Sequence, residues 1–205
     1  ALAGVFIVVA PAREALAVQP EAADVQQRVR VAVAVVTKEM RMAGAGRGAG
    51  DACADPMGAP VLPYRVGAIA SDAASGTFYR PDAISLAHVL PVSDGAPEVM
   101  RRTYYVKATP PDAFQLMQYD GRETDHPVLD NVVLLAFEYF GVPPGPRPDG
   151  PADPRLGAPE LTDDPWCPAA ESAARFDADL LRIRRIHVRL RVQAPGAFRG
   201  PAGPP

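Results

Sequence analysis

The sequence has few lysines and none of the common catalytic motifs. Lys38 and Lys107 are the only lysines, and the net charge is −3. Such a chain lacks the basic field with which proteins hold nucleic acid, so we expect no nucleic-acid partner. It contains no G-x-S-x-G, H-E-x-x-H or Walker motif, and its cysteines do not have the spacing of a zinc site. We therefore predict a protein that is not an enzyme and has no metal or other cofactor.

The three histidines leave one enzymatic alternative. His88 shares one side of a predicted strand with apolar residues, which favours a histidine in or beside the core over a base. His126 follows Asp125 in a predicted turn before Pro127, with no serine nearby to complete a triad. A hydrolase that uses His88, His126 or His187 remains an alternative hypothesis, and substitution of each histidine would test it.

Cysteine is also scarce, since Cys53 and Cys167 are the only two. Two cysteines are too few for a disulfide scaffold. Outside the cytosol they could join two loops by one disulfide. Two unpaired thiols are the other reading, and the sequence leaves both open.

The segment that organises the chain is residues 21–43, followed by a glycine-rich stretch at 44–50. Apolar residues recur at helical spacing, which predicts an amphipathic helix about 35 Å long. Pro20 suits its first turn and Gly44 its end. Valine lowers helix propensity, so the apolar stripe must pack on a sheet. Besides Ala32, the stripe contains the residues that we expect to mediate helix–sheet packing and assembly, namely Val25, Val29, Val33, Val36 and Met40.

Residues 1–10, ALAGVFIVVA, are apolar and stop at Pro11. A membrane span needs about 20 apolar residues, so this run is too short by itself. We interpret it as the end of a longer apolar helix that begins before Ala1, and a buried N-terminal segment is the alternative. Residues 1–43 would then form one helical spine.

The rest of the chain predicts an α+β protein in which the long N-terminal helix packs on an antiparallel sheet. We expect a Gly/Pro loop at 44–63, an antiparallel β head at 64–194 and a disordered tail at 195–205. Within the head, a Pro-rich loop at 141–174 would be pinned by Trp166 and Cys167. Its scattered acidic residues could hold calcium, but they lack the spacing of an EF-hand, so we expect them to be solvated. The predicted strands are 83–90, 103–108, 114–119, a late-starting strand after Pro127, 131–140 and 178–194.

Two of these strands carry distinctive patterns. Residues 131–140, NVVLLAFEYF, are apolar on both faces and predict the centre of a sheet covered by the helix. In 178–194, a row of arginine and histidine alternates with the apolar residues Ile186, Val188, Leu190 and Val192. We expect a bulge or a strand start near Arg184. We expect the basic row to be a solvated face or to meet an acidic neighbour subunit. Glu39 is expected on the helix surface and Glu138 at a strand edge.

Several short motifs resemble those of type IV pilin-like proteins, in particular minor pilins of the PilW type. DVQQRVRVA at 24–32 is similar to the family's D-(M/L)-Q-Q-R-x-R-x-(A/G), and KEMRMAG at 38–44 resembles its R-D-L-R-M-A-G helix end. The stretches at 119–121 and 128–132 resemble its Y-x-D-G … L-V-D-N-V, which leads into the F-x-Y strand at 137–139. The closing strand at 181–192 is similar to its I-R-x-V-x-V-x-L. The glycine and F-T-L-x-E of the prepilin cleavage site are not in the chain, and we expect them before Ala1.

The resemblance implies a minor pilin or pseudopilin with a structural role in the assembly or initiation of a type IV pilus-like filament. Its N-terminal helix would lie in the inner membrane before assembly, with the head on the periplasmic face, and then pack against other pilin subunits in an extracellular pilus at the cell surface. Pro11 and Pro20 would break or kink the helix where it leaves the bundle. A type II secretion minor pseudopilin is one alternative, and a secreted adhesin-like binding module that uses loop 141–174 is another.

Overall fold

The fold combines one long N-terminal helix with antiparallel strands, which confirms the predicted α+β class. A computed structural model describes residues 2–48, 50–64, 79–91, 98–109, 113–142, 153–163, 165–167 and 176–193, with the side chains of the first helix described from Ala22 onward. The predicted tail at 195–205 and much of loop 141–174 lie outside these residues.

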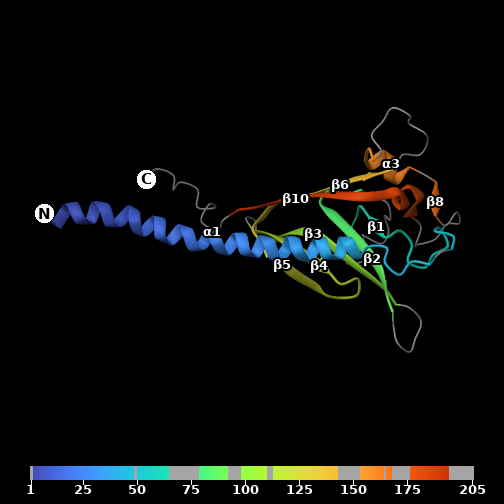
Figure 1. Cartoon of the computed structure of the whole chain (residues 1–205), viewed down its shortest axis with the longest axis horizontal. Coiled ribbons are helices and arrows are strands. Elements are labelled where there is room, and N and C mark those ends of the chain that lie inside the picture. The colour runs from blue at the N-terminus through green and yellow to red at the C-terminus, as the bar shows by residue number, and fades with distance from the viewer. Residues whose placement is uncertain are drawn as a thin grey trace.

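Helix α1 runs without interruption from Leu2 to Met42, over 41 residues and about 60 Å. The prediction of a helix start near Pro20 was therefore wrong, as was that of a break at Pro11 or Pro20. A proline inside a helix costs about 3 kcal/mol, but here good helix formers surround both positions. Figure 1 shows that α1 curves gently and that its N-terminal part extends well beyond the described strands.

The larger sheet contains five antiparallel strands in the order β1-β2-β3-β4-β5. Strand β2 (Ala83–Leu90) has the predicted bounds, and β1 (Val61–Leu62) pairs with it inside the segment that we expected to be loop. The other strands are β3 (Glu98–Thr109), β4 (Ala113–Tyr119) and β5 (Asp125–Asp130). Strand β5 begins before Pro127 rather than after it. Proline is tolerated there because β5 is an edge strand of this sheet.

A second sheet begins directly after β5, where the sequence predicted a single sheet. Asn131 separates the two strands and has a φ of 57°, a left-handed conformation that asparagine adopts more readily than most residues. Strand β6 (Val132–Gly141) then leaves the first sheet and becomes the central strand of the order β10-β6-β7. Its burial is one-sided, since Leu135, Phe137 and Tyr139 are buried while Leu134 is 45% exposed. The prediction of a central strand is therefore confirmed, and its one buried face agrees with the expectation that at least one side is covered.

Strand β10 (Ile183–Val192) pairs along nearly all of β6 and shows the predicted alternation, with its even-numbered apolar residues partly buried and its arginines exposed. The pairing register shifts between Ile183 and Arg185, which confirms the predicted irregularity near Arg184.

The described parts of loop 141–174 contain regular structure. They are β7 (Arg155–Leu156), the short helix α3 (Ala158–Thr162) and β8 (Trp166–Cys167). Strand β8 pairs with β9 (Phe176–Asp177), which leads into the 3-10 helix η1 (Ala178–Arg182) and then into β10.

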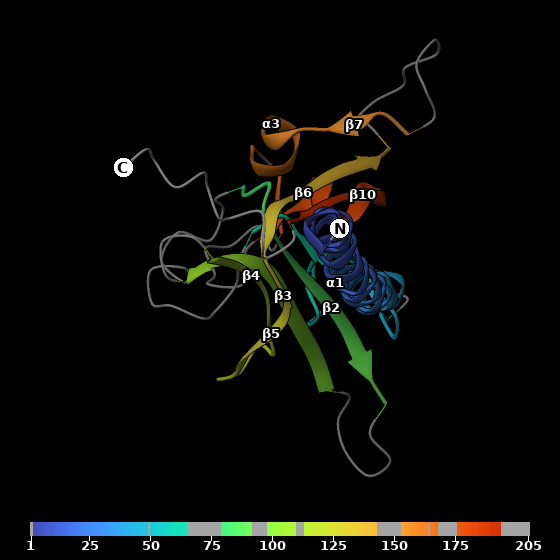
Figure 2. The ribbon, with the colours of Figure 1, turned by 90° about the vertical axis from the view of Figure 1, so that its left-hand side faces the viewer.

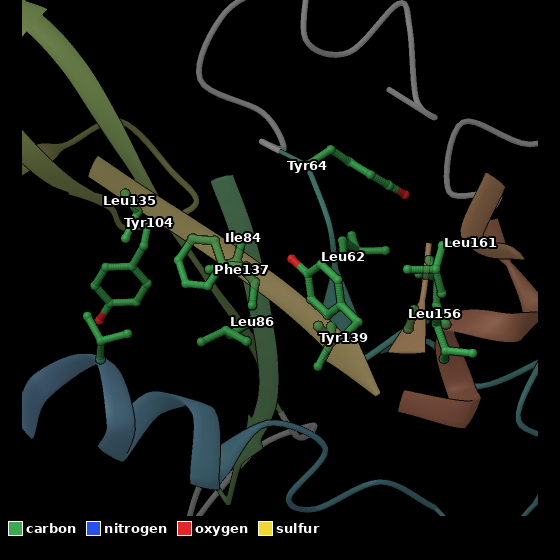
Figure 3. Packing of buried hydrophobic residues seen from close by; sticks show 14 of the residues in the cluster. Leu62, Tyr64, Ile84, Leu86, Tyr104, Leu135, Phe137, Tyr139, Leu156 and Leu161 are labelled. Atoms are coloured by element: carbon green, nitrogen blue, oxygen red, sulfur yellow. The ribbon is translucent and has the colours of Figure 1, made fainter. Parts of the chain in front are cut away.

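One apolar core joins α1 to both larger sheets. Viewed nearly along its axis, α1 lies between β10 on one side and β2 on the other (Figure 2). Figure 3 shows Tyr104 of β3 pointing toward α1, while Ile84, Leu86 and Phe137 fill the space between the sheets. Tyr104, Ile84 and Phe137 are each 1% exposed or less. The core therefore holds the C-terminal part of α1 against the head.

Candidate functional site

The candidate functional site is helix α1, which presents one face to the head and leaves another open. The docked face consists of Ala32, Val36 and Glu39, which are 1%, 6% and 5% exposed. Their spacing of four and three residues places them on one side of a helix. Val29 and Met40 are partly buried against the same core, as predicted. Val25 lines a small pocket with Leu129 and Val192 at the edge of the head.

Val33 does not pack on the sheet, so its place in the predicted packing stripe was wrong. It is 46% exposed, and neighbouring Val31 is 54% exposed. A helix turns about 100° per residue, so Val33 faces away from the direction of Ala32. The apolar stripe predicted from the sequence is therefore wider than the part of the helix surface that the head covers.

The open face of α1 is a groove in which apolar and cationic side chains alternate. Val33 and Ala34 lie beside Arg30, Lys38 and Arg41. The complete lining is Val29, Arg30, Val33, Ala34, Thr37, Lys38, Arg41 and Met42. This lining contains no acidic side chain, so the open face offers apolar contact area bordered by positive charge.

Glu39 anchors the docked face by a charged contact. Its carboxylate accepts a hydrogen bond from Nη1 of Arg102 on β3, although we expected Glu39 on the helix surface. The Arg102 side chain is 33% exposed, so the pair lies at the border of the core. Burial, followed by the negative charge of Glu39, raises the pKa of Tyr104, and Arg102 opposes this shift. No local sequence pattern could reveal this pair, because its members are 63 residues apart.

The end of α1 is fixed to β2 through backbone hydrogen bonds. Gly44 has a φ of 82°, which confirms it as the predicted helix stop. Its N–H donates to the carbonyl oxygen of Ala87 at 2.8 Å, and the N–H of Val89 donates to that of Ala45 at 2.9 Å. The direction of α1 is therefore set at its C-terminal end as well as along its docked face.

Cys53 and Cys167 form a disulfide, which resolves the alternatives that the sequence left open. Their Cα atoms are 4.8 Å apart, within the usual range for a disulfide. The bond joins the loop that follows α1 to β8. It thereby ties the helix-bearing segment to the excursion between β6 and β10.

The outer face of the smaller sheet carries the predicted basic row. Glu138 lies on the central strand rather than at an edge, which corrects our expectation. Its carboxylate is 3.2 Å from Nη2 of Arg155, 3.2 Å from Nδ1 of His187 and 3.1 Å from Nη2 of Arg189. Arg185 stacks 4.7 Å above the centre of the Phe140 ring. The Arg155, His187 and Arg189 side chains are 63%, 59% and 55% exposed, whereas the Glu138 carboxylate that they share is only 16% exposed.

The histidines considered for catalysis lie on three different strands. His88 is 4% exposed in β2, in agreement with a core position. His126 is exposed within β5, rather than in a turn, and His187 is exposed in β10 beside Glu138. Strand β10 belongs to a different sheet from β2 and β5, and β3 and β4 lie between β2 and β5 in theirs.

Comparison with known proteins gives no relative from which a role could be transferred. The chain matches no protein-family model, no curated protein and no solved structure. Within the described part of the chain, no helix is both long enough and apolar enough to cross a membrane.

Proposed function

We propose that this protein is a structural subunit of a type IV pilus-like filament, a minor pilin or pseudopilin that acts in filament assembly or initiation. The observation that supports this role is the division of α1 into an anchored and an extended part. Its C-terminal part is held by the core, while the 41-residue helix continues far beyond the head (Figure 1). A pilin-like fold is part of the same proposal.

In this role the open face of α1 meets the helices of neighbouring subunits. On this face Val33 is 46% exposed, and burying such a side chain contributes on the order of 1–2 kcal/mol. The cations that border the groove would select a partner helix with acidic residues at matching positions. Because Glu39–Arg102 and Gly44–Ala87 fix the helix to the head, helix packing would also set the orientation of the head in the filament.

The proposed partners are other pilin or pseudopilin subunits, and the proposed sites are the inner membrane before assembly and the cell surface afterwards. In this role the protein acts by packing against other subunits and converts no substrate, which is why we propose that it is not an enzyme. A type II secretion pseudopilin would use the same anchored helix, so both filament systems belong to the proposal.

Site-specific photo-crosslinking tests the proposal. A photoreactive phenylalanine analogue replaces Val33 in the full chain, which is expressed together with the neighbouring pilin-like genes of its source. We expect crosslinks from position 33 to the helix of another subunit. The control places the analogue at Glu123, an exposed residue between β4 and β5, and should yield far less product. Equal yields from both positions, or none from position 33 in a folded chain, would overturn the assignment.

A further inference from the structure

Three aspartates converge where α3, β9 and η1 meet. Asp163 follows α3, Asp177 ends β9 and Asp179 lies in the first turn of η1. One carboxylate oxygen from each residue lies within 4.8 Å of the others. Asp177 and Asp179 are only 1% and 4% exposed, whereas Asp163 is exposed to solvent. Asp163 was expected to be solvated, and no local sequence pattern connects it with the other two.

Protein donors contact two members of this aspartate cluster. Nη1 of Arg182 is 2.8 Å from Oδ1 of Asp179. Oδ1 of Asp177 accepts a hydrogen bond of 2.7 Å from the N–H of Asp179, as the cap of η1. The backbone N–H of Asp163 also faces the Asp177 carboxylate, but the second oxygen, Oδ2 of Asp177, is buried and accepts no hydrogen bond of normal geometry. A buried carboxylate oxygen without a partner is costly, so this atom points to a missing ligand.

We propose that Asp163, Asp177 and Asp179 bind a calcium ion. The donors are all carboxylate oxygens, which hard divalent cations prefer, and no histidine or thiolate is present to favour zinc. Calcium–oxygen bonds of about 2.3–2.6 Å place ligands on opposite sides of the ion up to about 5 Å apart. Magnesium bonds of about 2.0–2.1 Å allow only about 4 Å. The three carboxylate oxygens lie within 4.8 Å of one another, and this spacing suits calcium.

The electrostatics of the cluster support such an ion. Three ionised carboxylates whose oxygens lie within 4.8 Å of one another repel each other. A divalent cation would replace this repulsion with attraction to all three carboxylates. The exposed Asp163 gives the ion a path from solvent, and waters would complete the six to eight oxygen ligands that calcium takes.

The site would also have a structural consequence. It connects the end of α3 to the start of η1, directly before β10, and β8 beside it carries the disulfide cysteine Cys167. Calcium would thus hold together a region in which the described elements are short. Calcium binding at this site does not depend on the proposed filament role, and the site would stabilise the head whatever its function.

Terbium luminescence provides a direct test, because Tb³⁺ occupies calcium sites and is excited by a nearby tryptophan. Trp166 is the only tryptophan in the chain and is paired with Asp177 across β8 and β9. The full oxidised chain is treated with EDTA, titrated with Tb³⁺ and then with Ca²⁺ or Mg²⁺ as competitor. We expect sensitised emission that Ca²⁺ removes at lower concentration than Mg²⁺. Saturating Ca²⁺ should also raise the Tm by on the order of 5 °C over EDTA.

Two variants make the test specific. Asp163→Asn changes an exposed side chain and should fold normally by circular dichroism, yet weaken Tb³⁺ and Ca²⁺ binding by at least about tenfold through loss of one charged ligand. Glu123→Gln removes a surface acid elsewhere and should bind like the unchanged chain. The proposal is overturned if the unchanged chain shows neither sensitised emission nor a Tm shift, or if Asp163→Asn binds as tightly as Glu123→Gln.

Discussion

The two faces of α1 both contain alanine and valine but meet different surroundings. On the docked face, Val36 is 6% exposed and lies between buried Ala32 and Glu39. On the open face, Val33 is 46% exposed and lies among arginine and lysine side chains. The two valines are three residues apart on one helix. Composition alone therefore does not tell which valine stabilises the head and which is available to another molecule. The position of the sheets decides this.

The strongest test of this difference is a matched pair of aspartate substitutions. Val36→Asp places a carboxylate in the core without a partner and should lower the free energy of unfolding by about 4 kcal/mol or more. Val33→Asp keeps the carboxylate in solvent and should change it by no more than about 0.5 kcal/mol. Urea unfolding followed by circular dichroism measures both. Similar losses for the two variants would show that the two faces are not distinct.

A second test removes the charged anchor of the docked face. Arg102→Met leaves the Glu39 carboxylate buried without its partner, which should cost about 2–3 kcal/mol, less than for a fully buried pair because Arg102 is partly exposed. Arg122→Met removes an arginine from the exposed Arg122–Glu98 pair and should cost less than about 1 kcal/mol. If the two losses measured by urea unfolding are equal, the Glu39–Arg102 pair is not an anchor.

Some features of these two faces and of the head could be predicted from the sequence, and others could not. The Gly44 helix end and the alternation in β10 were predictable because each depends on local spacing or backbone conformation. The burial of Glu39 was not, since it depends on Arg102, 63 residues away. The division of the strands into two sheets was not predictable either, and it occurs at Asn131, whose backbone is left-handed. The aspartate cluster likewise combines segments that only the fold brings together.

A smaller effect should come from the helix end that orients both faces. Gly44→Ala forces a side chain into left-handed backbone, which costs about 1–2 kcal/mol, although the space beside Gly44 would accept a Cβ. Gly50→Ala is the control, because nothing lies within 4 Å of a Cβ there and φ is not positive. Thermal unfolding should show a lower Tm for Gly44→Ala alone. An unchanged Tm would mean that the Gly44 conformation does not hold the helix end.

The open face makes the smallest contribution to stability and, in this account, the largest to assembly. The most direct measurement is the incorporation of Val33→Asp into sheared filaments, compared by immunoblot with the unchanged chain in a strain that lacks its own copy. Loss of one apolar helix contact and burial of a charge should reduce incorporation at least about tenfold while the free energy of unfolding stays the same. Incorporation equal to that of the unchanged chain would contradict the claim that this face joins the helix to other subunits.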